Sequence, residues 1–303
     1  MTVPRRLLIA ILCASLAGCR PDEVPAQVTE PTLYDVTGVF QLPRLTESSG
    51  VAVSRSLDGV LWTHNDSGDE PWLYATDLSG AARGVFRVGG ARAVDWEDIA
   101  LGPCPGETRP CLYIADTGDN LESRPSVDLY IVPEPASLPL RTDSLVTLTA
   151  RRLRVRYADG PHDVEALAVS PDGEVMLISK GRTGSIGLYR LRAIPADSAT
   201  VLLQRSEQLA IVPQRSFGRL VTGAAISPSG RALVVRTYVD LVFYRLENGE
   251  LSDQAVCWLG MRDLQGEGVD FLDDSTLVLT SESVAGRPGT IARVRCPIVR
   301  PRP

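Results

Sequence analysis

Three glutamates stand at the same position in three similar apolar segments of the chain. They are Glu97 in DWEDIALG (95–102), Glu165 in DVEALAVS (163–170) and Glu267 in QGEGVDFL (265–272). Two more segments of the same shape carry a hydroxyl there: Ser49 in ESSGVAVS (47–54) and Thr222 in LVTGAAIS (220–227). Carboxylates held close together in a poorly hydrated place repel one another, so a group of them requires a compensating positive charge.

A hard divalent cation is the compensation that suits these residue types best. Calcium takes about six to eight oxygen ligands in flexible geometry. The chain has only two histidines, His64 and His162, which disfavours zinc. We therefore predict a calcium site, and its predicted ligands are Glu97, Glu165, Glu267, Asp98 and Asp116. Two alternatives stay open: the acids could cap turns and bind backbone amides, or they could be protonated or paired with basic groups.

The five segments are the expected first strands of a repeated unit. Each leads toward a turn rich in Asp, Gly, Ser or Pro, such as SPDG at 170–173. A second strand follows each turn, and a third often contains Leu-Tyr. A more polar fourth strand often closes the unit, as in GVFRVGG (84–90), RLRVRYA (152–158) and TVLLQRS (200–206).

Four-stranded antiparallel units that recur at intervals of about 45–68 residues predict an all-β fold, a β-propeller. Five blades are favoured, and six are the alternative because the interval between the second and third units is long. A β-sandwich is the remaining alternative. Residues 35–41 are expected to complete the last blade and so close the ring. Since first strands line a propeller's channel, the three glutamates, Ser49 and Thr222 should form a ring around its axis.

Charged residues also stand where the second strand of each unit is expected to end. That strand runs antiparallel to the first, so its end lies at the face where the first begins. The predicted ligand-binding residues at this mouth are Asp66, Lys180, Arg236, Glu282 and His162. A cation with Lys180 and Arg236 suits an anionic small molecule, although these two bases could simply neutralise neighbouring acids. For His162, beside Asp163, a local turn role is favoured over a role as a general base.

The N-terminus has the pattern of an export signal. Arg5 and Arg6 precede a short apolar stretch, and Leu16-Ala17-Gly18-Cys19 resembles the lipobox of bacterial lipoproteins. We expect a signal peptide at 1–18, a lipidated Cys19 with a flexible tether over 19–33, and the propeller over 34–299. The expected location is the cell envelope, anchored to the membrane by lipid. Arg20, where a retention signal would have Asp, favours the outer membrane in a Gram-negative cell.

Export makes disulfides the favoured state of the remaining cysteines. Cys104 and Cys111 bracket a short loop and can staple it, which leaves Cys257 with Cys296. Free buried thiols are the alternative. The net charge of −6 argues against nucleic-acid binding, and a monomer is expected.

Four stretches, SSGVAVS, WEDIALGP, LYIADTGDN and DVEALAVSPDG, resemble motifs of bacterial propeller proteins. These proteins are similar to the esterase-like domains related to β-propeller phytases, and the resemblance covers most of residues 35–296. It implies calcium in or over the channel, held by the three glutamates with Asp98 and Asp116 as lesser candidates. It does not imply phytase activity, because phytases use richer acidic and basic clusters.

Two functions are consistent with these patterns. The leading one is a binding module on the cell envelope for an anionic small molecule or an envelope protein. The alternative is a calcium-dependent hydrolase of a phosphoester, ester or lactone. The sequence shows no complete catalytic constellation, such as a GxSxG elbow, and this favours the binding module.

Overall fold

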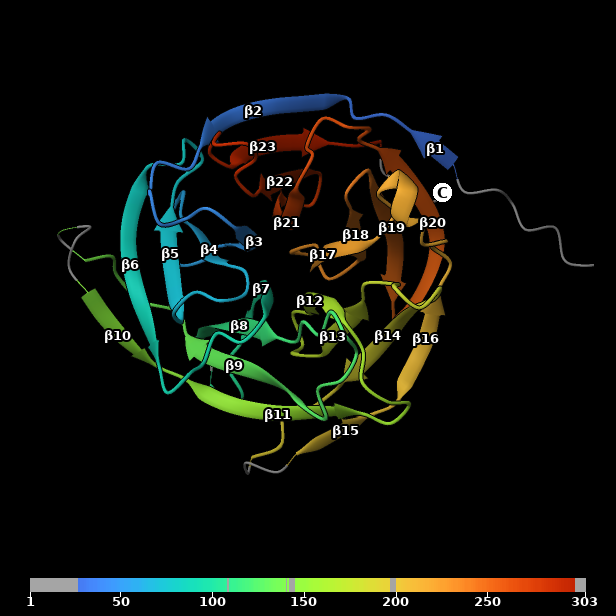
Figure 1. The fold of residues 1–303 in the computed structure, drawn as a ribbon, viewed down its shortest axis with the longest axis horizontal. Helices are drawn as coiled ribbons and strands as arrows, with labels where there is room; N and C mark the ends of the chain where they lie inside the picture. Colours follow the sequence, from blue (N-terminus) through green and yellow to red (C-terminus); the bar gives the residue numbers. More distant parts are fainter. Residues whose placement is uncertain (1–26, 108, 140, 142–144, 197–199, 298–303) are drawn as a thin grey trace, which may run out of the picture.

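The computed structural model describes residues 27–107, 109–139, 141, 145–196 and 200–297. These residues form five β-sheets arranged around one axis (Figure 1). The innermost strands are β3 (Ser48–Val53), β7 (Trp96–Pro103), β12 (Val164–Val169), β17 (Val221–Ile226) and β21 (Gly266–Asp273). The bounds of each of these strands differ by one residue at either end from those of a predicted first strand. The protein is therefore an all-β, five-bladed propeller, as predicted.

The middle strands follow the expected order in every blade. The second strands are β4 (Leu61–Asn65), β8 (Pro110–Asp116), β13 (Val175–Ser179), β18 (Ala232–Thr237) and β22 (Thr276–Ser281). The third strands are β5 (Trp72–Thr76), β9 (Val127–Pro133), β14 (Ile186–Leu191), β19 (Asp240–Glu247) and β23 (Thr290–Arg295). The fourth strands are β6 (Ala82–Gly89), β11 (Arg151–Tyr157), β16 (Arg205–Leu209), β20 (Glu250–Trp258) and β2 (Leu33–Val39).

The two ends of the domain close the ring together. β2, from the N-terminal part, pairs antiparallel with β23 as the outer strand of blade 5. This is the closure that the sequence predicts for residues 35–41. Because both ends of the domain contribute to one sheet, strand pairing within blade 5 closes the ring. The N-terminal part of the domain supplies the outer strand of this blade.

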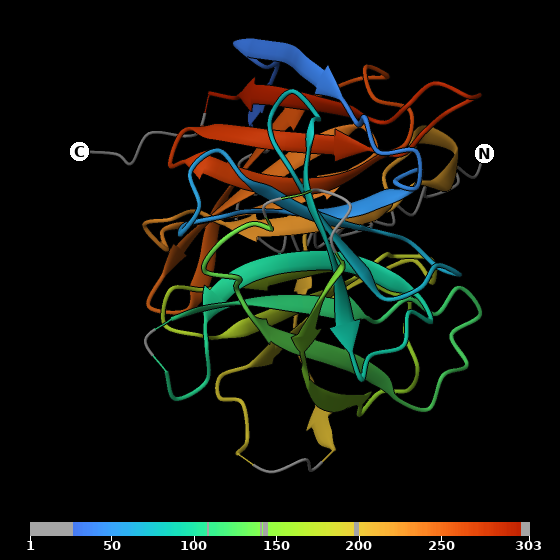
Figure 2. The ribbon, with the colours of Figure 1, turned by 90° about the vertical axis from the view of Figure 1, so that its left-hand side faces the viewer.

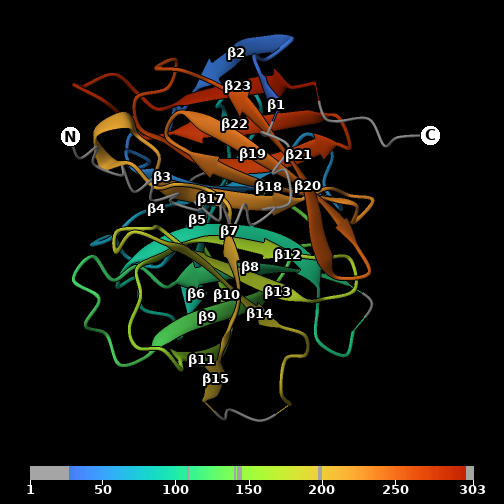
Figure 3. The same ribbon diagram turned by 90° about the vertical axis from the view of Figure 1, so that its right-hand side faces the viewer.

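Three blades carry a fifth strand that runs parallel to the fourth, at the rim of the ring. β1 (Gln27–Thr29) pairs with β20, β10 (Leu145–Thr149) with β6, and β15 (Val201–Leu203) with β11. β10 occupies the long interval that made six blades an alternative. β1 lies inside the predicted tether, and in both edge-on views β15 lies at the outer limit of the ring (Figures 2 and 3).

One predicted strand is divided between two blades. TVLLQRS (200–206) is predicted to close blade 3, but Val201–Leu203 forms β15 on blade 2. The outer strand of blade 3 is instead β16, which starts at Arg205 and pairs with β14. Alternation along one strand cannot show which neighbour it will pair with, so the prediction is wrong at this point.

The apolar core lies between the blades rather than in one central mass. Buried side chains form five clusters, one at each interface between neighbouring blades. In blades 1 and 3 the first two strands are buried along their whole length. Burial on both faces explains why these strands have continuous apolar sequences instead of strict alternation.

Both predicted disulfides are present. Cys104–Cys111 staples the β7–β8 hairpin, and Cys257–Cys296 joins the outer strand of blade 4 to the end of blade 5. The second closes the longer loop, with a sequence separation of 39 against 7.

Removing the longer disulfide should cost more stability than removing the shorter one. Loop-closure entropy grows with loop length, and a disulfide typically contributes about 2–4 kcal/mol. We expect Cys257→Ser with Cys296→Ser to lose about 1 kcal/mol more than Cys104→Ser with Cys111→Ser, by urea denaturation. Equal losses, or a larger loss for Cys104–Cys111, would contradict the expectation that the Cys257–Cys296 disulfide restricts the unfolded chain more strongly.

The signal peptide, Cys19 and the first part of the tether lie outside the described residues. Within the ranges described, no helix has the length and apolar character needed to cross a membrane.

Candidate functional site

A β-bulge interrupts the inner strand of every blade at the same position. In β7 the pairing passes from Trp96 with Asp116 to Asp98 with Ala115, which leaves Glu97 as the extra residue. Glu165 is the extra residue of β12, and Thr222 that of β17. β3 and β21 shift register next to Ser49 and Glu267. The predicted ring residues are therefore those that the bulges re-aim, as bulges beside functional sites often do.

The two hydroxyl members of the ring support its glutamates. Ser49 Oγ donates to the carbonyl of Glu97 at 2.6 Å, and Thr222 Oγ1 donates to the carbonyl of Glu267 at 3.2 Å. Each bond passes from one blade to the next. Hydrogen bonds between neighbouring blades therefore help to hold the ring of five positions, in addition to the strand pairing within each blade.

Acidic side chains from three blades meet at this end of the channel. Two groups of carboxylate oxygens each lie within 4.8 Å of one another: Asp66, Asp95 and Glu97, and Glu97, Asp163 and Glu165. We call these five residues the acidic mouth. Their oxygens are close enough for either group to hold a metal ion.

Burial dominates the electrostatics of the acidic mouth. It raises the pKa of Glu97 well above its usual value, and the Glu165 charge adds to this effect. Burial also raises the pKa of Glu165 to about 8, although the Lys180 ammonium acts in the opposite direction. Burial, with the charges of Asp66 and Asp163, raises the pKa of Asp95 to about 6. The cation-free mouth therefore retains protons at neutral pH, at least one of them on the neighbouring Glu97 and Glu165.

Bases lie beside these acids without neutralising all of them. Lys180 Nζ is 2.6 Å from Glu165 Oε1, and Arg182 pairs with Asp163. Burial acts to lower the pKa of Lys180, but the Glu165 carboxylate raises it overall, so Lys180 keeps its charge. Five carboxyl groups thus face two fixed positive charges, an excess that a divalent cation would reduce.

These raised pKa values predict that the cation-free protein loses stability as pH rises. Glu165 titrates near 8 in the folded protein and near 4.5 in the unfolded chain, so between these values the folded state binds more protons. The free energy of unfolding should therefore fall from pH 6.5 to 8 in chelator. His64 acts in the opposite direction near pH 6.5, because burial lowers its folded-state pKa to about 4 and only the unfolded chain binds a proton there, so the fall should be steepest above pH 7.

Urea denaturation at several pH values in chelator measures this slope. Glu165→Gln removes the titrating group and should make the slope shallower. A free energy of unfolding that rises with pH over this range in the wild type would contradict the retention of protons on Glu97 and Glu165.

Gly118 leaves room for the acidic mouth. A Cβ at this position would overlap Glu97 Oε1 and lie 2.5 Å from Asp95 Oδ2. Its backbone N–H donates to the Asp95 carbonyl at 3.2 Å. The DTGD loop that contains it therefore packs directly against the carboxylates, and only glycine fits there.

Asp98, a predicted ligand, has its oxygens engaged by backbone amides. Oδ2 accepts from Leu167 at 2.9 Å and from Ala224 at 3.1 Å, and Oδ1 accepts from its own neighbour Ile99 at 2.8 Å. The side chain is fully buried, and burial raises its pKa although the three amides act against this. Asp98 thus joins blades 2, 3 and 4 across the channel, which is the amide-binding alternative that the sequence left open.

Arg236, predicted to bind an anion, lies between blades 4 and 5. Nη1 donates to the carbonyls of Gly268 and Thr280 at 2.6 and 2.8 Å, and Nη2 pairs with Asp263 at 2.6 Å. Its side chain is fully buried. These contacts engage both terminal nitrogens, so Arg236 is not part of the site that we propose below.

The other predicted residues are not members of the acidic mouth. Glu267 is coupled by charge to Glu165 and Lys180 but belongs to neither metal-sized group. Glu282 directly follows β22 and accepts a hydrogen bond from Gln265 at 3.2 Å. Asp116 accepts from the Asp95 amide at 3.1 Å and pairs with Arg124 at 2.9 Å. His162 contacts Asp159 at 3.1 Å and packs against Tyr157 and Tyr189, away from the glutamates.

Asp95 and Asp163 are site residues that the prediction did not include. Both stand two positions before a ring glutamate, so the same alignment of inner strands contains the signal. Tyr238, in the β18–β19 turn, was also missed. Its hydroxyl interacts with Glu267, and burial raises its pKa. No pattern in the sequence distinguishes this tyrosine from the others.

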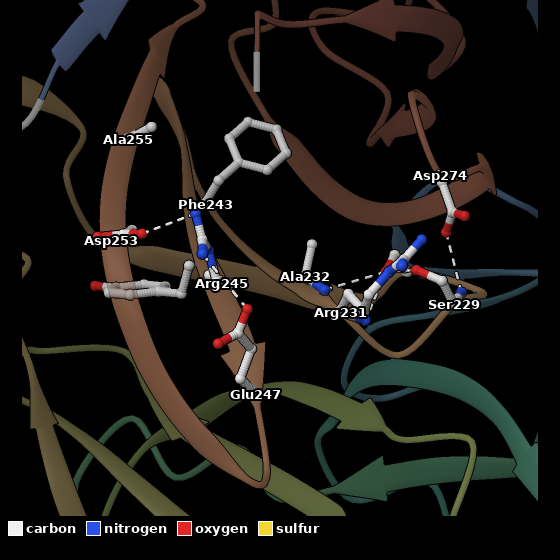
Figure 4. A pocket seen from close by; sticks show the side chains of 11 residues that line it. Ser229, Arg231, Ala232, Phe243, Arg245, Glu247, Asp253, Ala255 and Asp274 are labelled. Carbon is white, nitrogen blue, oxygen red and sulfur yellow. Dashed lines mark hydrogen bonds and ion pairs between the residues drawn. The ribbon is translucent and has the colours of Figure 1, made fainter. Parts of the chain in front are cut away.

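The face opposite the acidic mouth has a pocket of about 410 Å³ between blades 4 and 5 (Figure 4). Several of its charges are already engaged: Arg245 pairs with Asp253 at 3.0 Å, and Asp274 accepts from the Ser229 amide at 3.0 Å. None of its lining residues belongs to the acidic mouth.

Comparison with known proteins supports the fold alone. No protein-family model matches the chain, and no curated protein matches it. The PQQ-bound form of aldose sugar dehydrogenase from Streptomyces coelicolor is similar, with a TM-score of 0.50 and 12% identity. That match covers 88% of this chain and 99% of the other. A glucose dehydrogenase matches with a TM-score of 0.45 and 13% identity, over 87% of this chain and 99% of the other.

Proposed function

We propose that this protein binds a calcium ion in the acidic mouth and, through it, an anionic small molecule. The observation that carries the proposal is the repeated bulge, which directs Glu97 and Glu165 toward Asp66, Asp95 and Asp163. An all-carboxylate donor set from separate blades suits a hard cation with many oxygen ligands and flexible geometry. Neither histidine is in the mouth, and this disfavours zinc.

The nearby bases support an anionic ligand. Lys180 and Arg182 would lie beside a bound cation and could contact a phosphate or carboxylate held by it. Inorganic phosphate should therefore bind more tightly with calcium than with chelator, and Lys180→Met should weaken phosphate binding more than calcium binding. Isothermal titration measures both affinities. Phosphate binding that is independent of calcium would contradict a phosphate site that includes the cation.

A hydrolase is the second candidate. Lys180, which keeps its charge, could stabilise negative charge that develops on an ester or phosphoester, and a carboxylate of the mouth that does not contact the cation could accept a proton from the attacking water. Calcium, when bound, would add positive charge beside them. This proposal requires hydrolysis of at least one substrate in a panel of esters, lactones and phosphoesters, and loss of that activity in Glu97→Gln and Glu165→Gln. Unchanged hydrolysis in both variants would eliminate it.

PQQ, the cofactor bound to the similar aldose sugar dehydrogenase, does not suit the acidic mouth of this chain. PQQ is polyanionic, and the mouth has five carboxyl groups against the two bases Lys180 and Arg182. Its carboxylates would therefore meet like charges there. Without a bound cation, the residues present therefore do not fit this cofactor, and with calcium bound no described residue of the mouth distinguishes PQQ from other small anions.

We also propose that the domain is lipid-anchored at Cys19 on the cell envelope. The lipobox-like Leu16–Cys19 segment supports this location, and two disulfides agree with export. Cys19→Ser should move the protein from the membrane fraction to the soluble fraction. An unchanged distribution would contradict the anchor.

A further inference from the structure

A groove lies beside the acidic mouth, between blades 4 and 5. It has a volume of about 610 Å³, and its walls come from the 3-10 helix η1 (Arg215–Phe217), the β18–β19 turn and the β20–β21 connection. Figure 3 shows η1 on one face of the ring. Three large apolar side chains line this groove and are exposed: Trp258 by 47%, Met261 by 72% and Leu264 by 56%. Apolar side chains gathered in a hollow indicate contact with a ligand, whereas scattered ones do not.

Two residues connect the groove with the channel. Tyr238 lines the groove, and its hydroxyl interacts with the ring residue Glu267. Gln265 also lines it and donates to Glu282 at 3.2 Å. Tyr238 also interacts by charge with Lys180 and Glu165, so a ligand that extends past Tyr238 could reach from the groove toward the acidic mouth.

The charges of the groove favour an anionic ligand. Arg215 and Arg219 line one wall, and Arg219 is held by Asp240 at 2.6 Å. The only acid in the lining, Asp263, is neutralised by Arg236 at 2.6 Å. Arg219 is likewise neutralised by Asp240, so Arg215 gives the groove its positive charge, unlike the acidic mouth beside it.

We propose that this groove binds the apolar part of the anionic ligand whose charged group lies at the cation. The ligand class is a small acid or phosphoric monoester with an aromatic or short aliphatic group. The volume suits a small molecule, since ligand pockets span about 300–1,000 Å³. This inference rests on the proposed function, because the charged end of the ligand requires the calcium site.

Titration of the calcium-loaded protein with two probes tests the groove. 1-Naphthyl phosphate should bind about 10- to 100-fold more tightly than inorganic phosphate, because its rings leave water for the apolar wall. Met261→Ser with Leu264→Ser should reduce this ratio to about threefold or less and leave the affinities for phosphate and calcium unchanged. Leu202→Ser is the matched control, since Leu202 is 59% exposed on β15, on another blade. Equal affinity for the two probes, or a ratio that the double variant retains, would overturn the proposal.

A neutral probe separates failure of the groove from failure of the calcium site. Trp258 is half-exposed, Trp62 and Trp96 are fully buried, and Trp72 on blade 1 is partly buried, so quenching that is lost in Trp258→Phe reports occupation of the groove. 2-Naphthol in chelator should quench tryptophan fluorescence in the wild type but not in Trp258→Phe. Quenching without any calcium binding would support the groove and refute the cation site. Calcium binding without quenching would refute the groove alone.

Discussion

Glu97→Gln and Glu165→Gln should each weaken calcium binding by at least about 100-fold, because each removes a charged ligand from the centre of the acidic mouth. Glu97 belongs to both metal-sized groups and should show the larger loss. The uncharged amide relieves repulsion between the acids, so Glu97→Gln should not lose stability in chelator. Glu165→Gln should lose some stability, because it leaves the buried Lys180 ammonium without its partner. Isothermal titration gives the affinities, and denaturation in chelator gives the stabilities.

A buried acid outside the mouth provides the matched control. Glu134 is 8% exposed and accepts bonds from Ser54 and Trp62 between blades 1 and 2. Glu134→Gln should leave calcium affinity unchanged. The site assignment would be wrong if Glu134→Gln and Glu97→Gln weakened calcium binding equally, or if neither did.

Asp98→Ala should cost on the order of 3–6 kcal/mol of stability, because it leaves the buried amides of Leu167 and Ala224 without their acceptor. Asp98→Asn should cost less, since its carbonyl oxygen can accept from both amides while its amide group faces the Ile99 N–H. Urea denaturation in chelator measures both losses.

Calcium binding separates the two roles considered for Asp98. The folded Asp98→Asn variant should bind calcium within about threefold of the wild type, since the Asp98 oxygens are occupied by amides. A 100-fold loss of calcium affinity with normal stability would make Asp98 a ligand instead of a link between blades.

The inner strands are the part of the fold that the sequence predicts best. Their apolar runs recur five times with turn residues after them, and both signals are local. The rim strands β1, β10 and β15 are short, and their pairing depends on which blade edge lies nearby. No local pattern carries that information, so the division of residues 200–206 between blades could not be foreseen.

The position of the site is predictable, but its full set of residues is not. Regular alternation would send Glu97 and its neighbour Asp98 to opposite faces of the strand. The bulge at Glu97 breaks this alternation, so Glu97 faces the acidic mouth while Asp98 reaches the amides of blades 3 and 4. Bulges have no sequence signature here, so the sequence does not show that the Asp98 oxygens face backbone amides of neighbouring blades.

A calcium titration of the purified, metal-free domain near pH 7.5 is the most direct test of the central claim. We expect saturable binding with release of at least part of a proton, because calcium displaces a proton held by Glu97 and Glu165. At 100 times the dissociation constant, calcium should also add about 2.7 kcal/mol to the free energy of unfolding. Absence of binding heat, proton release and stabilisation at millimolar calcium would contradict a calcium site in the acidic mouth.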